Sequence, residues 1–149
     1  MEYEVPEQNL VEELEMRGIG YRKDNGYFVD VLQAAYLTEI GKAKYDDARD
    51  VVDKNEKLRL AYVVFRDLRK KMHVANYIEK DDVILAYEKG MVPKHAESKF
   101  VIKVIKNMNI KLDEMVKLRD DVRKARKDLL FAVVDGEKIS YYKFNEIEL

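Results

Sequence analysis

Apolar residues near the carboxyl end of the chain follow a pattern that predicts a buried strand and a hairpin. Residues 129 to 134 (Leu-Leu-Phe-Ala-Val-Val) are apolar on both faces, which is typical of a strand covered on both sides. Asp135-Gly136 then separates this run from a second β-prone run that begins at Ile139. An Asp-Gly pair between two such runs is a strong short-range hairpin signal. The pattern therefore predicts an interior strand, a tight turn and a returning strand.

The residues before this hairpin predict the rest of a mixed α/β sheet. Strand patterns cover residues 73–78, 83–87 and 98–105, and a turn is expected at 107–109. An amphipathic helix over 112–126 has Met115, Leu118 and Val122 facing inward. Strands on both sides of a helix, ending in a hairpin, are the pattern of an α/β domain with a mixed sheet.

Helical patterns dominate the first half of the chain. We expect helices over residues 7–16, 31–40, 48–52 and 55–71, and a small hairpin over 21–29 whose Asn25-Gly26 pair supplies the positive φ angles of the turn. Asp30 is the expected N-cap of the second helix, and Gly41 ends it. A charged run near Lys80 separates the two halves. We therefore predict a small helix-rich α/β amino-terminal domain over residues 1–80 and a mixed-sheet α/β domain over 81–149.

Composition excludes several classes of protein and site. The chain has 149 residues, a net charge of -1 and no cysteine, so it has neither a disulfide framework nor a thiolate metal site. His73 and His95 lack the spacing of a metal-binding pair. No apolar run reaches the roughly 20 residues that span a bilayer. The acidic amino terminus does not resemble a signal peptide, and we expect a cytoplasmic protein without a metal or cofactor.

Tyr87, His95 and Lys127 are candidates for metal-free RNA cleavage. In such a site a phenol takes the proton of the attacking 2′-hydroxyl, an imidazole protonates the leaving oxygen and a lysine stabilises the phosphate charge. Each residue also has an ordinary structural interpretation. Tyr87 fits a half-buried strand aromatic, His95 a solvated loop residue, and Lys127 a helix-end cation favoured by the macrodipole.

Five stretches, in the right order, resemble the tRNA splicing endonucleases (tRNA-intron endonucleases) of archaeal type. Phe65-Arg66-Asp67-Leu68-Arg69 resembles their Tyr-Arg-Asp-Leu-Arg box, and Ala35-Tyr36-Leu37 with Gly41-Lys42 resembles a helix of their amino-terminal domain. The resemblance runs from about Tyr27 to the chain end. It continues through the segments 87–90, 98–101 and 126–135, with Pro93 and Tyr141-Tyr142. It implies an endonuclease-like fold for the carboxy-terminal domain.

The resemblance also assigns positions in the family's active site. Tyr87 falls on the catalytic tyrosine and Lys127 on the catalytic lysine, but Glu97 occupies the place of the catalytic histidine, and His95 lies two residues early. An unperturbed glutamate has a pKa of about 4.3, so at neutral pH it donates no proton and repels a phosphate. The family's two RNA-gripping arginines fall on Asp120, with Arg119 one place away, and near Tyr142. We therefore expect no catalysis, with Tyr87 and Lys127 as remnants.

The family's mode of assembly implies partners. One subunit inserts an acidic hairpin loop into a basic cleft of another, and carboxy-terminal strands pair edge to edge. Asp135, Gly136 and Glu137 lie at the loop position, and residues 141–149, with Tyr141, Tyr142 and Phe144, provide a β edge suited to a partner strand. These features predict a structural subunit that forms a heterodimer or heterotetramer with a catalytic tRNA splicing endonuclease subunit, and that meets precursor tRNA through the complex.

Two other interpretations stay open at this point. In the first, the loop shifts its register so that His95 serves as general acid beside Tyr87 and Lys127. Such an active, metal-independent subunit would leave a 2′,3′-cyclic phosphate and a 5′-hydroxyl. In the second, the chain is an unrelated α/β binding module.

Overall fold

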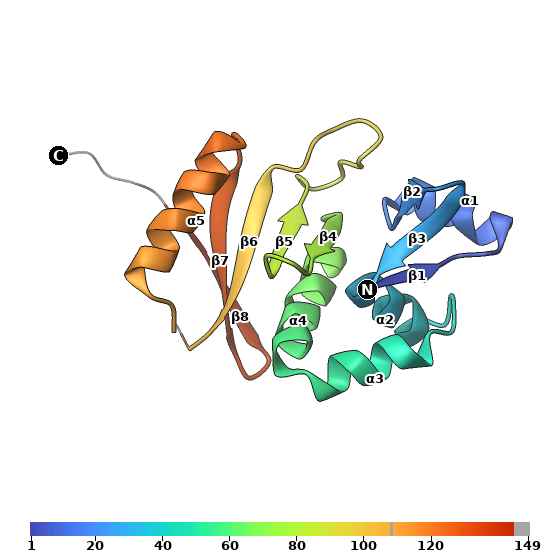
Figure 1. The fold of residues 1–149 in the computed structure, drawn as a ribbon, viewed down its shortest axis with the longest axis horizontal. Coiled ribbons are helices and arrows are strands. Elements are labelled where there is room, and N and C mark those ends of the chain that lie inside the picture. Colours follow the sequence, from blue (N-terminus) through green and yellow to red (C-terminus); the bar gives the residue numbers. More distant parts are fainter. Residues whose placement is uncertain (108, 145–149) are drawn as a thin grey trace.

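The amino-terminal part of the chain combines a small antiparallel sheet with four helices. The computed structural model describes residues 1–107 and 109–144. Its first sheet has the strand order β1-β3-β2. The strands are β1 (Glu2–Glu4), β2 (Tyr21–Lys23) and β3 (Gly26–Asp30), and the helices are α1 (Gln8–Arg17), α2 (Val31–Glu39), α3 (Asp46–Lys54) and α4 (Glu56–Lys70). Figure 1 shows this part beside a larger sheet that fills the other half of the molecule.

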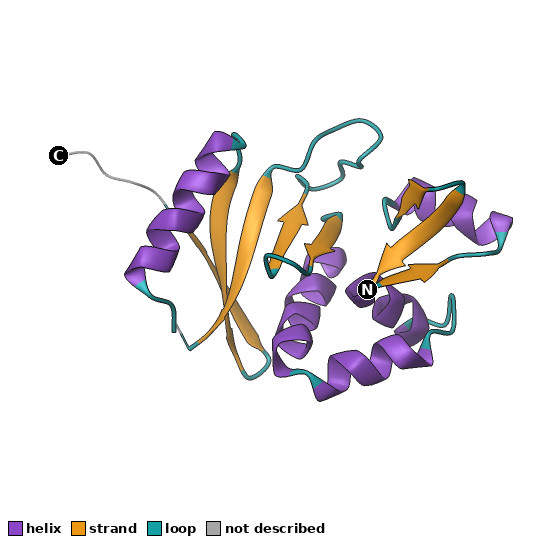
Figure 2. Cartoon of the chain, viewed as in Figure 1, coloured by secondary structure: helices purple, strands orange, loops and turns teal. Residues whose placement is uncertain are grey.

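The larger sheet is mixed, as the sequence predicts, and has the order β4-β5-β6-β7-β8. Only the β6–β7 pair is parallel, and α5 (Leu112–Lys124) is the crossover between these two strands. The remaining bounds are β4 (Ala75–Ile78), β5 (Val83–Ala86), β6 (Phe100–Lys106), β7 (Asp128–Asp135) and β8 (Lys138–Lys143). Figure 2 shows α5 against this sheet and α4 between it and the amino-terminal part. The α/β fold class predicted from the sequence is confirmed.

Strand β7 is covered on both faces, which explains its continuous apolar run. Alternate side chains of a strand point to opposite faces. Leu129 and Phe131 pack in a cluster with Leu118 and Val122 of α5, whereas Ala132 and Val134 belong to the main core that α4 lines on the other face. The two-sided pattern therefore identified an interior strand correctly.

The helix boundaries follow local capping chemistry. Asp30 caps α2 through a hydrogen bond from the Gln33 amide (2.8 Å), and the Gln33 side chain accepts one from the Asp30 amide (3.0 Å), completing a capping box. Asn55 caps α4 by accepting a hydrogen bond from the Leu58 amide (3.1 Å). In the β2–β3 turn, Asp24 (φ 49°) and Asn25 (φ 66°) adopt the positive angles, so the turn lies one residue earlier than the expected Asn-Gly pair.

The main core runs without interruption from the amino-terminal elements into the larger sheet. It includes Leu14 and Leu37 from the first half and Ile102 and Ala132 from the second. Strand β4 pairs with β5, so the predicted domain boundary near Lys80 falls within the β4–β5 hairpin. The five-stranded sheet therefore begins on the amino-terminal side of that boundary.

Candidate functional site

Tyr87 directly follows β5, and both its backbone amide and its backbone carbonyl are hydrogen-bonded. Its amide donates to the Val74 carbonyl (2.9 Å), and its carbonyl accepts a hydrogen bond from Nδ1 of His73 (2.8 Å). The His73 ring in turn lies edge-on to Phe100, with centroids 6.5 Å apart. Sequence reasoning did not connect His73 with this site. The β4–β5 register explains this proximity, because pairing Ala75 with Ala86 places residues 73 and 74 beside residue 87.

The environment of Tyr87 keeps its phenol protonated. Partial burial raises the pKa of the Tyr87 hydroxyl, and the negative charge of Glu97 raises the same pKa further. A phenol acts as a base only through its phenolate form, so both effects weaken Tyr87 as a proton acceptor.

Lys127 lies at the same rim of the sheet, just before β7. Its Nζ donates to the backbone carbonyl of Ser98 (2.6 Å) and to the Ser98 hydroxyl oxygen (2.6 Å). The parallel pairing of β6 with β7 explains this proximity, since the Asp128 amide donates to the Lys99 carbonyl (2.9 Å) directly beside it. The antiparallel partner of β6 is β5, which ends just before Tyr87. One rim thus carries Tyr87, the segment 97–98 and Lys127.

His95 lies away from these contacts. It is exposed, its backbone amide closes a turn with the Val92 carbonyl (3.0 Å), and its ring makes no hydrogen bond or ion pair with any residue that the structure describes. Glu97 is also exposed, and its charge acts on Tyr87.

The loop that carries His95 and Glu97 packs against the end of α1. A Cβ atom added to Gly18 (φ +70°) would lie 2.9 Å from Val74 and 3.0 Å from Pro93. Only glycine fits there without displacing the loop. The Gly90 amide also donates to the Met72 carbonyl (3.0 Å), which ties the loop to the end of α4. The amino-terminal part therefore helps to set the position of the loop.

A basic cavity of about 270 Å³ adjoins Lys127. Its lining brings together five cationic side chains and one carboxylate: Arg119, Val122, Arg123, Arg126, Lys127, Asp128, Leu129, Lys143 and Phe144. We call it the basic cavity. The carboxylate of Asp128 lies 3.8 Å from Nζ of Lys143. Positive charge therefore dominates beside the candidate lysine.

Asp120 does not line the basic cavity, although the sequence places it where the family has a gripping arginine. It accepts hydrogen bonds from Nε (3.2 Å) and an η nitrogen (3.0 Å) of Arg119. Arg123, Arg126 and Lys143 line this cavity with Lys127, a grouping that was not predicted from the sequence. Arg119 and Arg123 are one helical turn apart, a spacing that could have suggested a shared basic face.

The predicted assembly elements lie at the other end of β7 and along β8. Asp135, Gly136 and Glu137, which we call the hairpin tip, are all exposed, and Gly136 adopts φ +63° at the first turn position. This is the position that a type II′ turn reserves for glycine. Neither acidic side chain of the hairpin tip makes an ion pair with a described residue. The tip therefore presents two carboxylates to solvent.

Strand β8 is an edge of the sheet, but only part of its side-chain surface is open. The Tyr141 hydroxyl donates to Asp67 (2.7 Å), and the Phe144 ring packs edge-on against Phe131 at 5.8 Å. Tyr142 is 52% exposed. Of the predicted edge, residues 145–149 lie outside the described residues, as does residue 108 of the turn expected at 107–109.

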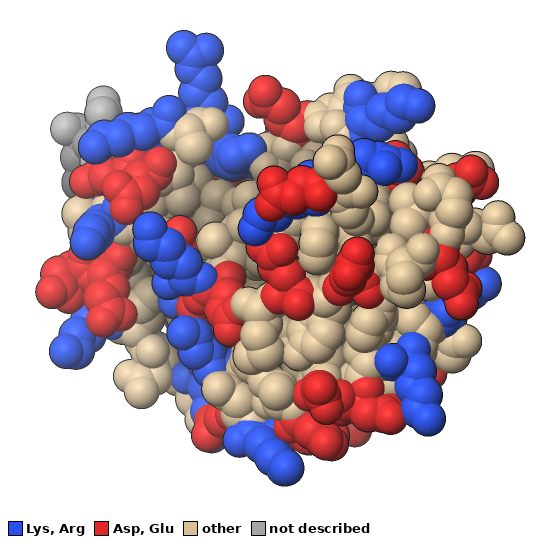
Figure 3. Space-filling model, turned by 45° about the vertical axis from the view of Figure 1, so that its right-hand side comes forward, with Lys and Arg blue, Asp and Glu red and all other residues tan. Residues whose placement is uncertain are grey.

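Charged side chains of both signs are mixed over the face drawn in Figure 3. Among residues 1–107 and 109–144, no group of three His, Asp or Glu residues could hold a metal ion. The helices of the same residues include none that is long and apolar enough to cross a membrane.

Comparison with known proteins supports the family that the motifs predict. No family model matches the chain. The tRNA-splicing endonucleases of Pyrococcus horikoshii and Pyrococcus abyssi are each 28% identical to it over 145 residues, which cover 89% of this chain and 83% of the relative. The resemblance to archaeal tRNA-splicing endonucleases is therefore confirmed, and it extends over both halves of the chain.

Proposed function

We propose that this relative of archaeal tRNA-splicing endonucleases is the structural, non-catalytic subunit of a heteromeric tRNA-splicing endonuclease. It would assemble with a catalytic subunit and position it for intron removal from precursor tRNA. The observation that carries the proposal is Glu97, a carboxylate where the family has its proton-donating histidine. The names of the Pyrococcus relatives support a role in tRNA splicing.

Each proton-transfer step of RNA cleavage is weakened at this rim. The leaving 5′-oxygen needs a proton, which an ionised carboxylate cannot supply. The attacking 2′-hydroxyl needs a base, but burial and Glu97 both raise the pKa of Tyr87. Lys127 still offers a positive charge, although Ser98 occupies two of its three donor positions. Charge stabilisation alone leaves no route for the two protons.

Two exposed surfaces and one cavity support the proposed assembly. The hairpin tip presents Asp135 and Glu137 to solvent on a tight turn, which fits insertion into a basic cleft of the catalytic subunit. The edge of β8, with Tyr142 exposed, fits pairing with a strand of the partner. The basic cavity beside Lys127 gives the assembled complex a further positive surface for the phosphates of precursor tRNA.

Cleavage assays test the proposal directly. The purified chain, a catalytic tRNA-splicing endonuclease chain, and the two together are each incubated with an intron-containing precursor tRNA. We expect no cleavage by this chain alone, and cleavage by the pair that His95→Ala in this chain does not change. Cleavage by this chain alone that disappears with His95→Ala would instead establish the active-subunit alternative.

A binding experiment tests the hairpin tip. Asp135→Lys with Glu137→Lys should weaken association with the catalytic chain, because two attractive charges become repulsive, while the exposed turn keeps the fold intact. The control is Asp50→Lys with Asp53→Lys, the same charge change at exposed positions of α3. If both double variants elute with the catalytic chain as the unchanged protein does, the hairpin tip does not dock.

A further inference from the structure

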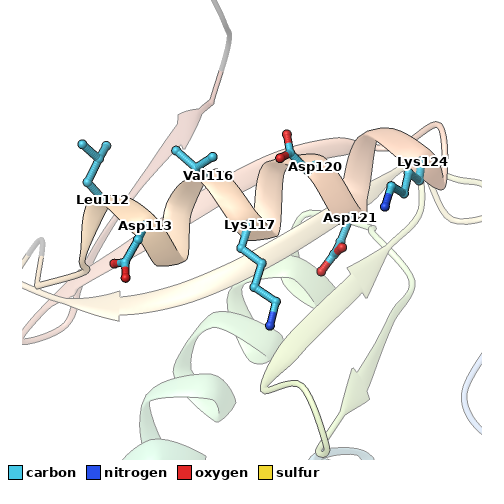
Figure 4. A pocket seen from close by; sticks show the side chains of 7 residues that line it. All are labelled: Leu112, Asp113, Val116, Lys117, Asp120, Asp121 and Lys124. Carbon is cyan, nitrogen blue, oxygen red and sulfur yellow. The ribbon is translucent and has the colours of Figure 1, made fainter.

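The outer face of α5 carries four charges of alternating sign. Asp113, Lys117, Asp120 and Lys124 are separated by four, three and four residues. With about 3.6 residues per turn, this spacing places all four on one narrow stripe of the helix. They line a shallow hollow along the helix together with Leu112, Val116 and Asp121, and Figure 4 shows these seven side chains arrayed along α5.

This stripe has no partner in the described part of the chain. The opposite side of α5 packs on the sheet through Met115, Leu118 and Val122. Asp113, Lys117 and Lys124 make no ion pair with any described residue, even though i,i+4 partners are available in the same helix. Among the described residues Asp120 makes an ion pair with its neighbour Arg119, and Leu112 is 73% exposed. Apolar surface and unpaired charge therefore lie side by side.

The charge order is self-complementary under a two-fold rotation. A two-fold axis placed midway between residues 118 and 119 aligns two copies of α5 antiparallel. It brings Lys117 opposite Asp120 of the second copy, and Asp113 opposite Lys124 of the second copy. Each pair occurs twice, so four opposite-charge contacts form. An interface in which one surface patch meets itself in this way is the isologous contact of a symmetric dimer.

We propose that this chain self-associates through α5, with the two helices packed antiparallel across that axis. The apolar side chains support the same arrangement. Leu112 and Val116 lie on one flank of the stripe, and the rotation places this flank on the same side of the interface as its own copy, so apolar surface from both copies borders the charge pairs. The proposal concerns the chain by itself and does not depend on its role in splicing.

The small buried area and the exposed ion pairs of this interface predict a weak dimer. One helical face buries less than the roughly 1,200 Å² at which standard interfaces begin, and exposed ion pairs each add little. We therefore expect a weak dimer that dissociates on dilution. It should also weaken with salt, because the Debye length falls from about 30 Å at 0.01 M to about 8 Å at 0.15 M ionic strength.

Sedimentation equilibrium of charge-reversal variants tests the proposal. Lys117→Glu and Asp120→Lys should each weaken dimerisation about tenfold or more at low salt, because each places like charges opposite one another twice. An equimolar mixture of the two variants should dimerise again, since the introduced glutamate then faces the introduced lysine. The double variant Lys117→Glu with Asp120→Lys should also recover, to within about threefold of the unchanged chain.

Lys57→Glu is the matched control, because it makes the same charge change at an exposed position of α4 and should leave dimerisation unchanged. Circular dichroism of each variant checks that α5 still folds. A chain that stays monomeric at every concentration would overturn the proposal. So would a dimer that neither single variant weakens, which would form elsewhere (at the β8 edge, for example), or single variants whose mixture fails to recover.

Discussion

Asp30 should make the stability of the fold depend on pH in a direction opposite to that of a carboxylate whose pKa is lowered on folding. Its side chain accepts hydrogen bonds from the amides of Gln33 (2.8 Å) and Tyr77 (3.0 Å), so it joins the start of α2 to β4. Burial nevertheless raises its pKa from 3.8 to about 6, against the opposing effect of these backbone amides. The folded chain therefore holds a proton at Asp30 more tightly than the unfolded chain does.

The magnitude follows from the difference between the two pKa values. A rise of about two units corresponds to roughly 3 kcal/mol at about 1.36 kcal/mol per unit. Because the pKa is raised on folding, this contribution is complete below pH 3.8 and is lost as the pH rises to about 6. At neutral pH the fold carries an ionised Asp30 at that cost, which is what remains after the backbone hydrogen bonds have offset part of the effect of burial.

The contribution of Asp30 to the free energy of unfolding can be measured by urea denaturation of the unchanged chain and of Asp30→Asn. Unfolding is followed by circular dichroism between about pH 4 and 7. The unfolding free energy of the unchanged chain minus that of Asp30→Asn should fall by about 2 to 3 kcal/mol over this range. Asp53→Asn, at an exposed position, provides the control and should give a flat difference. A difference for Asp30→Asn that is constant, or that grows with pH, would refute the reasoning.

Two further substitutions test the packing around the larger sheet. Phe65→Ala removes a fully buried ring that lies edge-on to Tyr36, and we expect a loss of about 3–5 kcal/mol in unfolding free energy, measured by urea denaturation. Tyr141→Phe removes the hydroxyl that donates to Asp67, and should cost about 0.5–1.5 kcal/mol in the same assay, with a smaller loss at a pH low enough to protonate Asp67.

Local signals in the sequence predicted most elements because their causes are local. Asp30 and Asn55 indicated where α2 and α4 begin. The side chain of a capping residue accepts a hydrogen bond from a backbone amide only two or three residues ahead, so the signal is local. The two-faced run of β7 identified an interior strand for the same reason. The β2–β3 turn was misplaced by one residue, because Asp24 and Asn25 adopt positive φ, a conformation that Asp and Asn reach more readily than other non-glycine residues.

Features of the site that depend on strand register were beyond local reasoning. The approach of Lys127 to Ser98 requires the parallel register of β6 and β7, which are separated by α5. The pairing of His73 with Tyr87 requires the β4–β5 register. The basic cavity likewise gathers side chains from α5, the start of β7 and the end of β8. Such groupings become visible only once the sheet is assembled.

The charges around Lys127 fit the structural role that we propose. A phosphate needs positive charge to stay bound, whereas cleavage also needs an acid and a base. Arg123, Arg126 and Lys143 surround Lys127 with positive charge, and Asp120 lies outside this cavity. Burial and the charge of Glu97 both raise the pKa of Tyr87. In the proposed structural subunit, Glu97 also stands at the position that the resemblance assigns to the family's acid. Weakened proton transfer beside a positively charged cavity is the combination that fits the proposed role, in which the subunit helps hold RNA and leaves the cutting to its partner.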